Sequence, residues 1–258
     1  MICVGIDAGS RAIKIVLIDA NTNEMLASGS VEQGVFSDEL AQQLLKQLLD
    51  QCDLRMSGIV RVVATGYARN QISIANTTVT EITCHGRGVY HLVPDTRTII
   101  EIGGQDSKML KLDAAGFVRD FAMNDRCAAG TGRFLEMVAV RLGVGLSDMG
   151  GMAAQSQNPA IISSMCIVFA ETEIIGLLAT GTPAEDIVAG VQTSIVTRVA
   201  SMAGKNITPA VVFTGGVAMV PGMDRALESV VGQSVCIAPN PQMTGALGAA
   251  LLASEQVN

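Results

Sequence analysis

An internal repeat with a spacing of 94 residues limits the folds open to this chain more than any other feature. Each copy reads as a strand, an acidic residue, a glycine turn and a second strand that carries a lysine. A duplicated unit of this kind predicts two similar subdomains that face each other across a cleft. Chance agreement over so few positions is the alternative. The matched residues are Ile6 with Ile100, Asp7 with Glu101, Gly9 with Gly103 and Lys14 with Lys108.

The composition is that of a folded α/β protein. Of the 258 residues, 49% are apolar and 16% are charged, which provides a sizeable core and excludes disorder. Short strand-like runs alternate with helical patterns, and helices dominate after residue 127. We predict a first subdomain over residues 1–93 and a second over residues 94–258, with the C-terminal helix packing back on the first. The strongest helices are expected at Arg133–Leu142, Glu171–Leu178, Pro183–Ala203 and Gly245–Ala253.

The net charge of −7 is spread evenly, with −3 on residues 1–129 and −4 on residues 130–258. No basic stripe is present, which argues against nucleic acid and anionic membranes as partners. Aromatic residues make up 3% of the chain, with no Trp, so a base-stacking surface is not expected. The N-terminal segment lacks signal-peptide features, and the six cysteines contain no CxxC pair. These features predict a cytoplasmic protein with reduced thiols.

The two glycine turns of the repeat are candidate phosphate-binding sites. Glycine lets a phosphate approach the main chain and its N–H groups. Lys14 would add a positive charge, and a carboxylate such as Asp7 suits Mg²⁺, usually through water. Each turn by itself is an ordinary hairpin turn. The presence of both, together with Gly215-Gly216 after a third strand, favours a nucleotide site.

These turns resemble the phosphate-1, phosphate-2 and adenosine motifs of the actin/sugar-kinase/heat-shock ATPase superfamily. The three stretches are Gly5-Ile6-Asp7-Ala8-Gly9-Ser10, Ile102-Gly103-Gly104-Gln105-Asp106 and Val211-Val212-Phe213-Thr214-Gly215-Gly216-Val217. Within that superfamily, two cysteine segments narrow the match. The segments at 124–134 and 163–171 resemble those of the 2-hydroxyacyl-CoA dehydratase activators, which are ATPases of the BadF/BadG/BcrA/BcrD type. The stretches Ala64-Thr65-Gly66-Tyr67 and Glu81-Ile82-Thr83-Cys84-His85 also match.

The resemblance implies an actin-like ATPase fold (ribonuclease H-like) with ATP in the cleft. Asp7 would organise Mg²⁺ through water, and either Gln105 or Asp106 would position the attacking water. Gln242 is a weaker candidate on the adenine side. The implied nucleotide-binding residues are Asp7, Gly9, Ser10, Arg11, Ala12, Lys14, Gly103, Gly104, Gln105, Gly215, Gly216 and Gln242.

The resemblance also implies a homodimer in which Cys127 and Cys166 of both subunits hold one [4Fe–4S] cluster. A cubane cluster needs four thiolates, one chain offers two in suitable loops, and two-fold symmetry supplies the rest. Helices expected near Thr131 and Ala170 would place each thiolate close to a helix N-terminus, which stabilises negative charge. A shared zinc ion would satisfy the same residues, so only the resemblance favours iron.

The other cysteines are expected to be structural. Cys3, Cys52 and Cys236 lie in or beside apolar elements, and we expect them to be buried thiols. Cys84 with neighbouring His85 could be half of a metal site, but it lacks a second pair. The acidic pair Glu171 and Glu173 is expected to begin a helix and to favour its dipole.

The function that the resemblance implies is an ATP-dependent transfer of one low-potential electron to a partner enzyme. The partner would be a dehydratase or reductase, and reduced ferredoxin or flavodoxin would be the electron donor. The alternative is a small-molecule kinase of the same superfamily, which would use the cleft and keep the cysteines as structural residues. Iron content would distinguish the two.

Overall fold

The computed structural model describes residues 1–164, 166–202, 204 and 207–257 of the chain. These residues form two compact units. The first unit comprises Met1–Asp95, Leu112–Arg119 and Gln242–Asn258, and the second comprises Thr96–Lys111 and Asp120–Pro241. The chain therefore passes between the units several times, whereas the sequence analysis placed one boundary between residues 93 and 94.

The first unit is built on a five-stranded mixed sheet in the order β3-β2-β1-β4-β5. Strand β1 pairs antiparallel with β2 and parallel with β4, so the hairpin of the repeat lies at the centre of the sheet. The strands are β1 (Ile2–Ala8), β2 (Ala12–Asp19), β3 (Met25–Glu32), β4 (Ile59–Thr65) and β5 (Thr77–Thr78).

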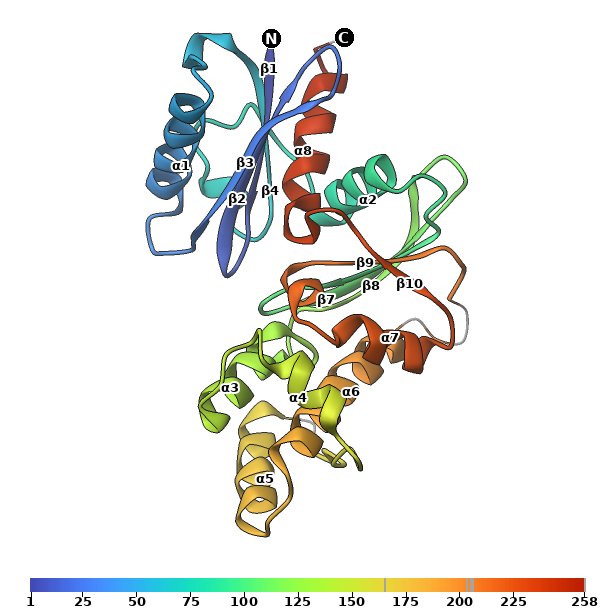
Figure 1. The fold of residues 1–258 in the computed structure, drawn as a ribbon. Coiled ribbons are helices and arrows are strands. Elements are labelled where there is room, and N and C mark those ends of the chain that lie inside the picture. Colours follow the sequence, from blue (N-terminus) through green and yellow to red (C-terminus); the bar gives the residue numbers. More distant parts are fainter. Residues whose placement is uncertain (165, 203, 205–206, 258) are drawn as a thin grey trace. The chain divides into compact units, whose positions relative to one another are not determined.

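Alternate residues of the central strands face two different hydrophobic clusters, as the period of two in a strand requires. Val4 and Ile6 of β1 pack in a cluster with the leucines of α1 (Ser37–Gln51). Cys3 lies in the other cluster, with the alanines and leucines of α8 (Thr244–Glu255). Helices α1 and α8 thus cover opposite faces of the first sheet (Figure 1).

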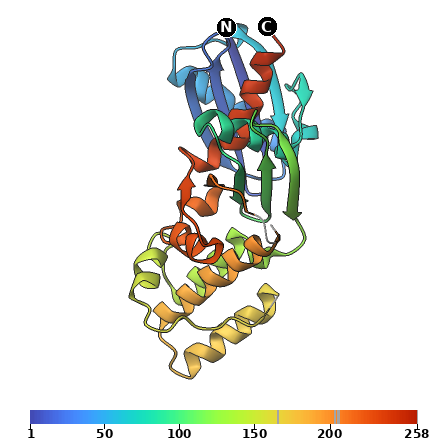
Figure 2. The ribbon, with the colours of Figure 1, turned by 90° about the vertical axis from the view of Figure 1, so that its right-hand side faces the viewer.

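Helix α8 approaches its neighbours at backbone distance because the residues at the contacts are small. A Cβ on Gly5 of β1 would lie 1.9 Å from the carbonyl oxygen of Ala246, and one on Gly248 would lie 1.8 Å from that of Cys84. Cys84 belongs to α2 (Glu81–Leu92), the helix beside α8 in the first unit (Figure 2). This close packing assigns the C-terminal helix to the first unit.

The second unit repeats the sheet of the first. Its strand order is β10-β9-β6-β7-β8, so β6 to β10 take the places of β1 to β5. The central strand again pairs antiparallel with the next strand and parallel with the fourth. The predicted duplication is therefore confirmed. The strands are β6 (Thr98–Ile102), β7 (Ser107–Leu112), β8 (Val118–Asn124), β9 (Val211–Thr214) and β10 (Val235–Ile237).

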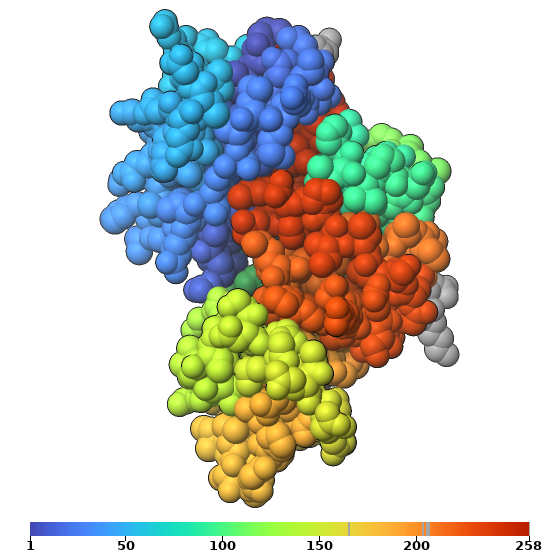
Figure 3. Space-filling model, in the orientation of Figure 1, coloured from blue at the N-terminus to red at the C-terminus, as the bar shows by residue number. Residues whose placement is uncertain are grey.

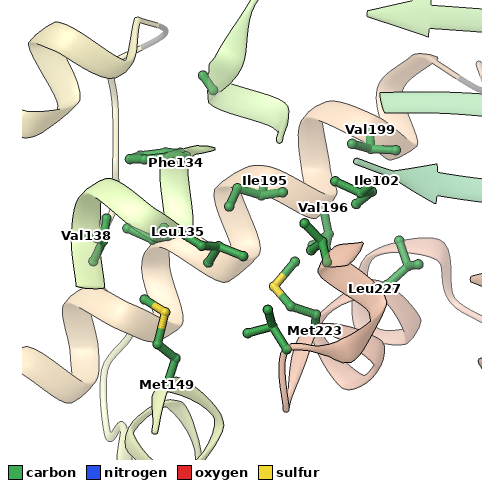
Figure 4. Packing of buried hydrophobic residues seen from close by; sticks show 14 of the residues in the cluster. Ile102, Phe134, Leu135, Val138, Met149, Ile195, Val196, Val199, Met223 and Leu227 are labelled. Carbon is green, nitrogen blue, oxygen red and sulfur yellow. The ribbon is translucent and has the colours of Figure 1, made fainter. Parts of the chain in front are cut away.

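A helical segment lies between the third and fourth strands of the second sheet. Phe134 and Leu135 from α3, Val196 from α6 and Met223 from α7 are fully buried in one cluster (Figure 4). The helices are α3 (Gly132–Leu142), α4 (Met149–Gln155), α5 (Ile167–Ala179), α6 (Ala184–Met202) and α7 (Met223–Val231).

The observed helix bounds correct one prediction. Helix α5 begins at Ile167, directly after Cys166, so Glu171 and Glu173 lie beyond its first turn and do not cap it. The exposed apolar residues at the start of α5 gave no amphipathic signal. Residue Ala203, at the end of one predicted helix, lies outside the described residues. Within the described ranges, no helix is both long enough and apolar enough to span a membrane.

Candidate functional site

Asp7 and Lys14 form the polar centre of the first hairpin. They are cross-strand partners in the register of β1 and β2, and Lys14 Nζ lies 3.1 Å from Asp7 Oδ2. The Asp7 carboxylate is buried, whereas the Lys14 side chain keeps 20% of its surface exposed. The first hairpin therefore holds an ion pair that a ligand can reach from the lysine side.

Glycines from two other elements enclose Asp7. Gly66 follows β4 with a φ of +88°, and a Cβ there would lie 2.4 Å from Asp7 Oδ1. A Cβ on Gly245 would lie 3.3 Å from Asp7 Oδ2 and 3.2 Å from Nε2 of His85. His85 is buried, and its Nδ1 lies 3.0 Å from the Thr244 hydroxyl. Asp7 thus pairs with Lys14 of β2 and lies close to the backbone at Gly66, after β4, and at Gly245 of α8.

The turn after Asp7 is a short hairpin connection. The Gly9 N–H donates to the Ala12 carbonyl at 3.2 Å, and Gln33 Nε2 donates to the Gly9 carbonyl at 2.9 Å. Gly9, Ser10, Arg11 and Ala12 are all partly exposed. Ser10 and Arg11 are therefore accessible in the turn that the sequence predicts to bind phosphate.

The second hairpin carries the equivalent pair, Glu101 and Lys108. They are again cross-strand partners, and Lys108 Nζ lies 2.8 Å from Glu101 Oε2. Lys108 also contacts Asp106 Oδ2, and its side chain is only 2% exposed. Gln105, in contrast, is exposed. The second lysine is therefore enclosed by two carboxylates, one of which was a candidate catalytic residue.

The turn between Glu101 and Lys108 is hydrogen-bonded to the start of α3. The N–H of Gly132 donates to the Gly103 carbonyl and that of Arg133 to the Gly104 carbonyl, each at 2.9 Å. The Gly103 N–H itself donates to the Asp106 carbonyl at 2.9 Å. Two of the N–H groups that every helix N-terminus leaves without intrahelical partners are thus satisfied by the turn.

Gly215 stands in the second unit where Gly66 stands in the first. It follows β9 with a φ of +89°, and a Cβ there would lie 2.6 Å from Glu101 Oε1. Its N–H and the Thr214 hydroxyl donate to the Pro241 carbonyl at 2.9 and 2.6 Å. Gly216 is exposed. Gln242, the weaker candidate for the adenine side, belongs to the first unit.

Cys127 is exposed and lies in a segment held by its own neighbours. The Asn124 side chain donates to the Cys127 carbonyl at 2.7 Å and accepts from the Cys127 N–H at 3.0 Å. A 3₁₀ turn over Ala128–Gly130 then leads into α3. Asn124 therefore fixes the backbone of Cys127.

Cys166 is exposed and is the N-cap residue of α5. The segment before it is held by Glu173, whose carboxylate accepts from the backbone N–H groups of Ser163 and Ser164 at 2.9 Å and from the Ser163 hydroxyl at 2.6 Å. Burial raises the pKa of Glu173, but these hydrogen bonds outweigh it and bring the pKa to about 2. Arg198 donates to the Ser164 carbonyl at 2.9 Å. Met165, within this motif, lies outside the described residues.

The helices that follow the two cysteines contact each other. Arg141 of α3 forms an ion pair with Glu171 of α5, and both helices lie at the surface of the second unit (Figure 3). Within the described residues, three or more His, Cys, Asp or Glu side chains nowhere gather in a metal-binding group. The second unit therefore presents two exposed thiols in segments that lead into α3 and α5, and an ion pair joins these two helices.

The remaining cysteines divide between the core and the surface. Cys3 and Cys84 are buried, and burial raises the pKa of the Cys84 thiol to about 12, which makes it a poor metal ligand. Cys52 and Cys236 are exposed, so the prediction that they are buried was wrong. Cys52 follows the last turn of α1, and Cys236 lies on the short edge strand β10, where neither side is fully covered.

Several residues of these sites were not among the predicted site residues, including Gly66, Asn124, Gly132 and Glu173. A second alignment of the two halves would have shown Gly66, because Thr65-Gly66 ends β4 as Thr214-Gly215 ends β9. Asn124 and Gly132 lie within the cysteine segment at 124–134 that carries the family resemblance. Glu173 bonds Ser163 and Ser164, and the sequence carries no spacing signal for it.

Comparisons with known proteins identify the family of this chain. The model of the BadF/BadG/BcrA/BcrD ATPase family matches residues 4–253. The 2-hydroxyisocaproyl-CoA dehydratase activator of Clostridioides difficile is 42% identical over 99% of this chain and 96% of its own. The activator of lactoyl-CoA dehydratase from Anaerotignum propionicum is 43% identical over 99% of this chain and 98% of its own.

Solved structures confirm the predicted actin-like ATPase fold. The activator of the 2-hydroxyisocaproyl-CoA dehydratase from Clostridium difficile with bound ADPNP superposes with a TM-score of 0.93, at 42% identity over 99% of this chain and 95% of that one. A ROK hexokinase from Thermus thermophilus, 15% identical with a TM-score of 0.54 over both whole chains, shares the fold alone. The chain belongs to the BadF/BadG/BcrA/BcrD ATPase family, together with the activators of 2-hydroxyacyl-CoA dehydratases that it resembles.

Proposed function

We propose that this chain is an ATP-dependent iron–sulfur activator, which transfers one low-potential electron to a partner dehydratase or reductase. The observation that carries the proposal is the pair of exposed thiols, Cys127 and Cys166, each placed just before a helix in the unit that also holds the second glycine turn. A kinase has no use for this pair. The relatives named as activators support the same role.

The first hairpin would bind the metal–nucleotide complex. Asp7 is buried and fixed from several sides, so its carboxylate can orient Mg²⁺ through water without reorganising. Lys14 is partly exposed beside it and would contact the phosphates, together with Ser10 and Arg11. Gly9 and Ala12 would shape the turn.

The second hairpin would hold the terminal phosphate and the attacking water. Gly103 and Gly104 would form the phosphate turn, and Gly215 and Gly216 would line the adenosine side with Gln242. Asp106 already contacts Lys108, which supports a structural role for it. Gln105 is exposed in the same turn and is the better candidate for positioning the water.

The donor set fits a shared cluster. Cys127 and Cys166 lie at the starts of a 3₁₀ turn and of α5, and both are exposed. A second copy of the chain would supply the other two ligands. A [4Fe–4S] cluster held there would carry the single electron. These two thiols belong to the part of the chain that packs around α3 and α5.

The reaction balances with a one-electron donor and a one-electron acceptor. Reduced ferredoxin or flavodoxin would supply the electron, and the partner's own iron–sulfur centre would receive it, while ATP and water give ADP and phosphate. For a one-electron couple, ~59 mV corresponds to ~1.4 kcal/mol. Nucleotide can drive uphill transfer only by binding one conformation of the chain better than the other.

Iron content tests the proposal. Anaerobically purified protein should hold about four iron atoms per dimer, the number in one cubane cluster. Cys127→Ser and Cys166→Ser should abolish or strongly reduce the brown chromophore, while the exposed control Cys52→Ser should keep it. Full iron retention in both single variants would refute the cluster assignment.

Coupling is tested by the reduction potential of the cluster, measured without nucleotide and with a non-hydrolysable ATP analogue. We expect the potential to fall with the analogue. Identical potentials would leave no driving force for electron transfer. The Gln105→Ala variant should bind the analogue normally and hydrolyse ATP slowly, which separates the binding step from hydrolysis.

A further inference from the structure

The start of α3 is bonded directly to the second glycine turn. We propose that Gly132 and Arg133 are positioning residues, which transmit the state of the nucleotide from Gly103 and Gly104 to the backbone that carries Cys127. The inference rests on the proposed function and adds to it the connection between its two sites.

The geometry of the peptide group gives this contact a direction. In a trans peptide the C=O and the following N–H point to opposite sides. The carbonyls of Gly103 and Gly104 accept from α3, so the N–H groups of Gly104 and Gln105 point away from that helix. Those N–H groups are the donors that a terminal phosphate would use. A phosphate that turns either peptide must therefore move α3 or break its bond to the turn.

Glycine is needed at position 132 because the two segments touch. A Cβ there would lie 3.2 Å from the Gly103 carbonyl oxygen, 3.4 Å from Gly104 Cα and 3.1 Å from a methyl group of Val217. Such a side chain would push the turn and the helix apart by a few tenths of an ångström. Thr131 precedes the helix, but its hydroxyl donates to the Ala128 carbonyl and makes no cap to α3. The turn replaces the missing side-chain cap.

The movement would reach Cys127 through a short and well-bonded path. Thr131 N–H and its hydroxyl both bond to the Ala128 carbonyl, at 3.1 and 2.7 Å, and Ala128 directly follows the cysteine. Asn124 fixes Cys127 from the other side. Phe134 and Leu135 are fully buried and anchor α3 in the hydrophobic cluster of the second unit (Figure 4).

Hydrogen–deuterium exchange of the unaltered holoenzyme tests the link without any variant. With MgADPNP, exchange at the N–H groups of Gly132 and Arg133 should slow by about fivefold relative to the nucleotide-free protein, because a held turn keeps both bonds closed. The Ala170 N–H, which donates to the Cys166 carbonyl inside α5, serves as an internal comparison. Unchanged exchange at residues 132 and 133 in protein that demonstrably binds MgADPNP overturns the inference.

A variant tests whether the link carries the signal. Gly132→Ala should bind MgADPNP and retain iron but lose most of the effect of nucleotide on the rate at which an iron chelator bleaches the cluster. The matched control is Gly151→Ala in α4, where a Cβ would meet nothing within 4 Å. We expect the nucleotide effect to be at least about fivefold in wild type and control, a typical allosteric coupling, and below about twofold in Gly132→Ala.

The outcomes separate the two proposals. A wild-type protein whose chelation rate ignores nucleotide refutes the coupling in the proposed function. A wild-type response that Gly132→Ala keeps in full overturns the inference alone. Thermal unfolding of the variant, compared with Gly151→Ala, shows whether a lost response comes with a loss of folding, and the exchange experiment then decides.

Discussion

The two hairpins of the repeat, each with a glycine from a neighbouring strand end, place equivalent residues in different environments. Asp7, Lys14 and Gly66 in the first unit correspond to Glu101, Lys108 and Gly215 in the second, with the same cross-strand register and the same positive φ at the glycine. Lys14 is 20% exposed, whereas Lys108 is 2% exposed and contacts a second carboxylate from Asp106.

This difference indicates that the two acid–lysine pairs have different roles. In the first pair, solvent and ligand can reach the lysine. Lys14 can therefore bind a phosphate in place of Asp7, and Asp7 can bind a hydrated metal ion in place of Lys14. In the second pair, the buried lysine contacts two carboxylates at once and holds the hairpin together. The shared geometry thus leaves the lysine of the first pair accessible and buries the lysine of the second.

The largest expected effect comes from removing the buried lysine. Lys108→Met leaves Glu101 and Asp106 without their shared cation, and breaking a buried pair in this way costs about 3–5 kcal/mol of unfolding free energy. Lys14→Met should cost clearly less, because its side chain and the ion pair are partly solvated. Urea unfolding of the two variants measures both values. Equal losses would mean that the two hairpins do not differ in the way proposed.

Substitution of the two carboxylates should affect MgATP turnover in the opposite order, with a larger loss at Asp7 than at Glu101. Asp7→Asn should lower MgATP turnover by about 100-fold, equivalent to ~2.7 kcal/mol, because the charge that orients the hydrated metal is lost. Its unfolding free energy should change little by comparison. Glu101→Gln should instead lower stability more than it lowers the turnover of the folded fraction. Turnover and urea unfolding on the same preparations separate the cases, and parallel losses in both variants would count against these different roles.

The two glycines allow a smaller and symmetrical test. Gly66→Ala and Gly215→Ala both force a left-handed backbone on a residue with a Cβ, at a cost of about 1–2 kcal/mol before any clash. In each case the new methyl meets the acidic residue of the hairpin. We expect both variants to lower the free energy of unfolding. Beyond that, Gly66→Ala, beside Asp7, should reduce the maximal turnover, and Gly215→Ala, on the proposed adenosine side, should mainly raise the KM for ATP. Thermal melts and turnover together check this.

The repeat and the family motifs predicted the fold because each consists of residues that lie close together in the sequence. The spacing of Asp7 and Lys14, repeated at Glu101 and Lys108, set the strand register in advance, and the structure pairs these residues directly across their strands. The nucleotide roles assigned to the turns stay predictions.

The parts that the sequence did not predict depend on bonds between distant segments. Gly132 lies 29 residues beyond Gly103, and its contact with the turn is made by backbone groups that any residue possesses. Glu173 was expected to favour a helix dipole, but α5 begins four residues before Glu171, so its carboxylate is free to reach back to Ser163 and Ser164. Cys52 and Cys236 are exposed because the neighbouring elements of the described structure do not pack over them, and the local sequence gives no sign of this.

The smallest expected loss of stability comes from replacing Glu173, a carboxylate of the second unit that holds the segment before Cys166, and this loss depends on pH. The pKa of this group is about 2 in the folded protein against 4.5 in an unfolded chain, because hydrogen bonds from Ser163 and Ser164 outweigh burial. A lowered pKa contributes stability that is complete above the unfolded value and is lost as pH falls from 4.5 towards 2. Glu173→Gln should therefore cost about 1–2 kcal/mol at pH 7, less than the full shift since the group is partly solvated.

The cost should shrink steadily as urea unfolding is repeated at lower pH below 4.5, where the wild-type carboxylate loses its advantage. Glu185→Gln, which removes a partly exposed carboxylate at the start of α6, is the control. If the Glu173 variant differs from wild type by the same amount at pH 7 and near pH 3, the carboxylate's charge does not hold the Cys166 segment. In that case Arg198, which bonds the Ser164 carbonyl, would be the main support of the backbone that presents the second thiol.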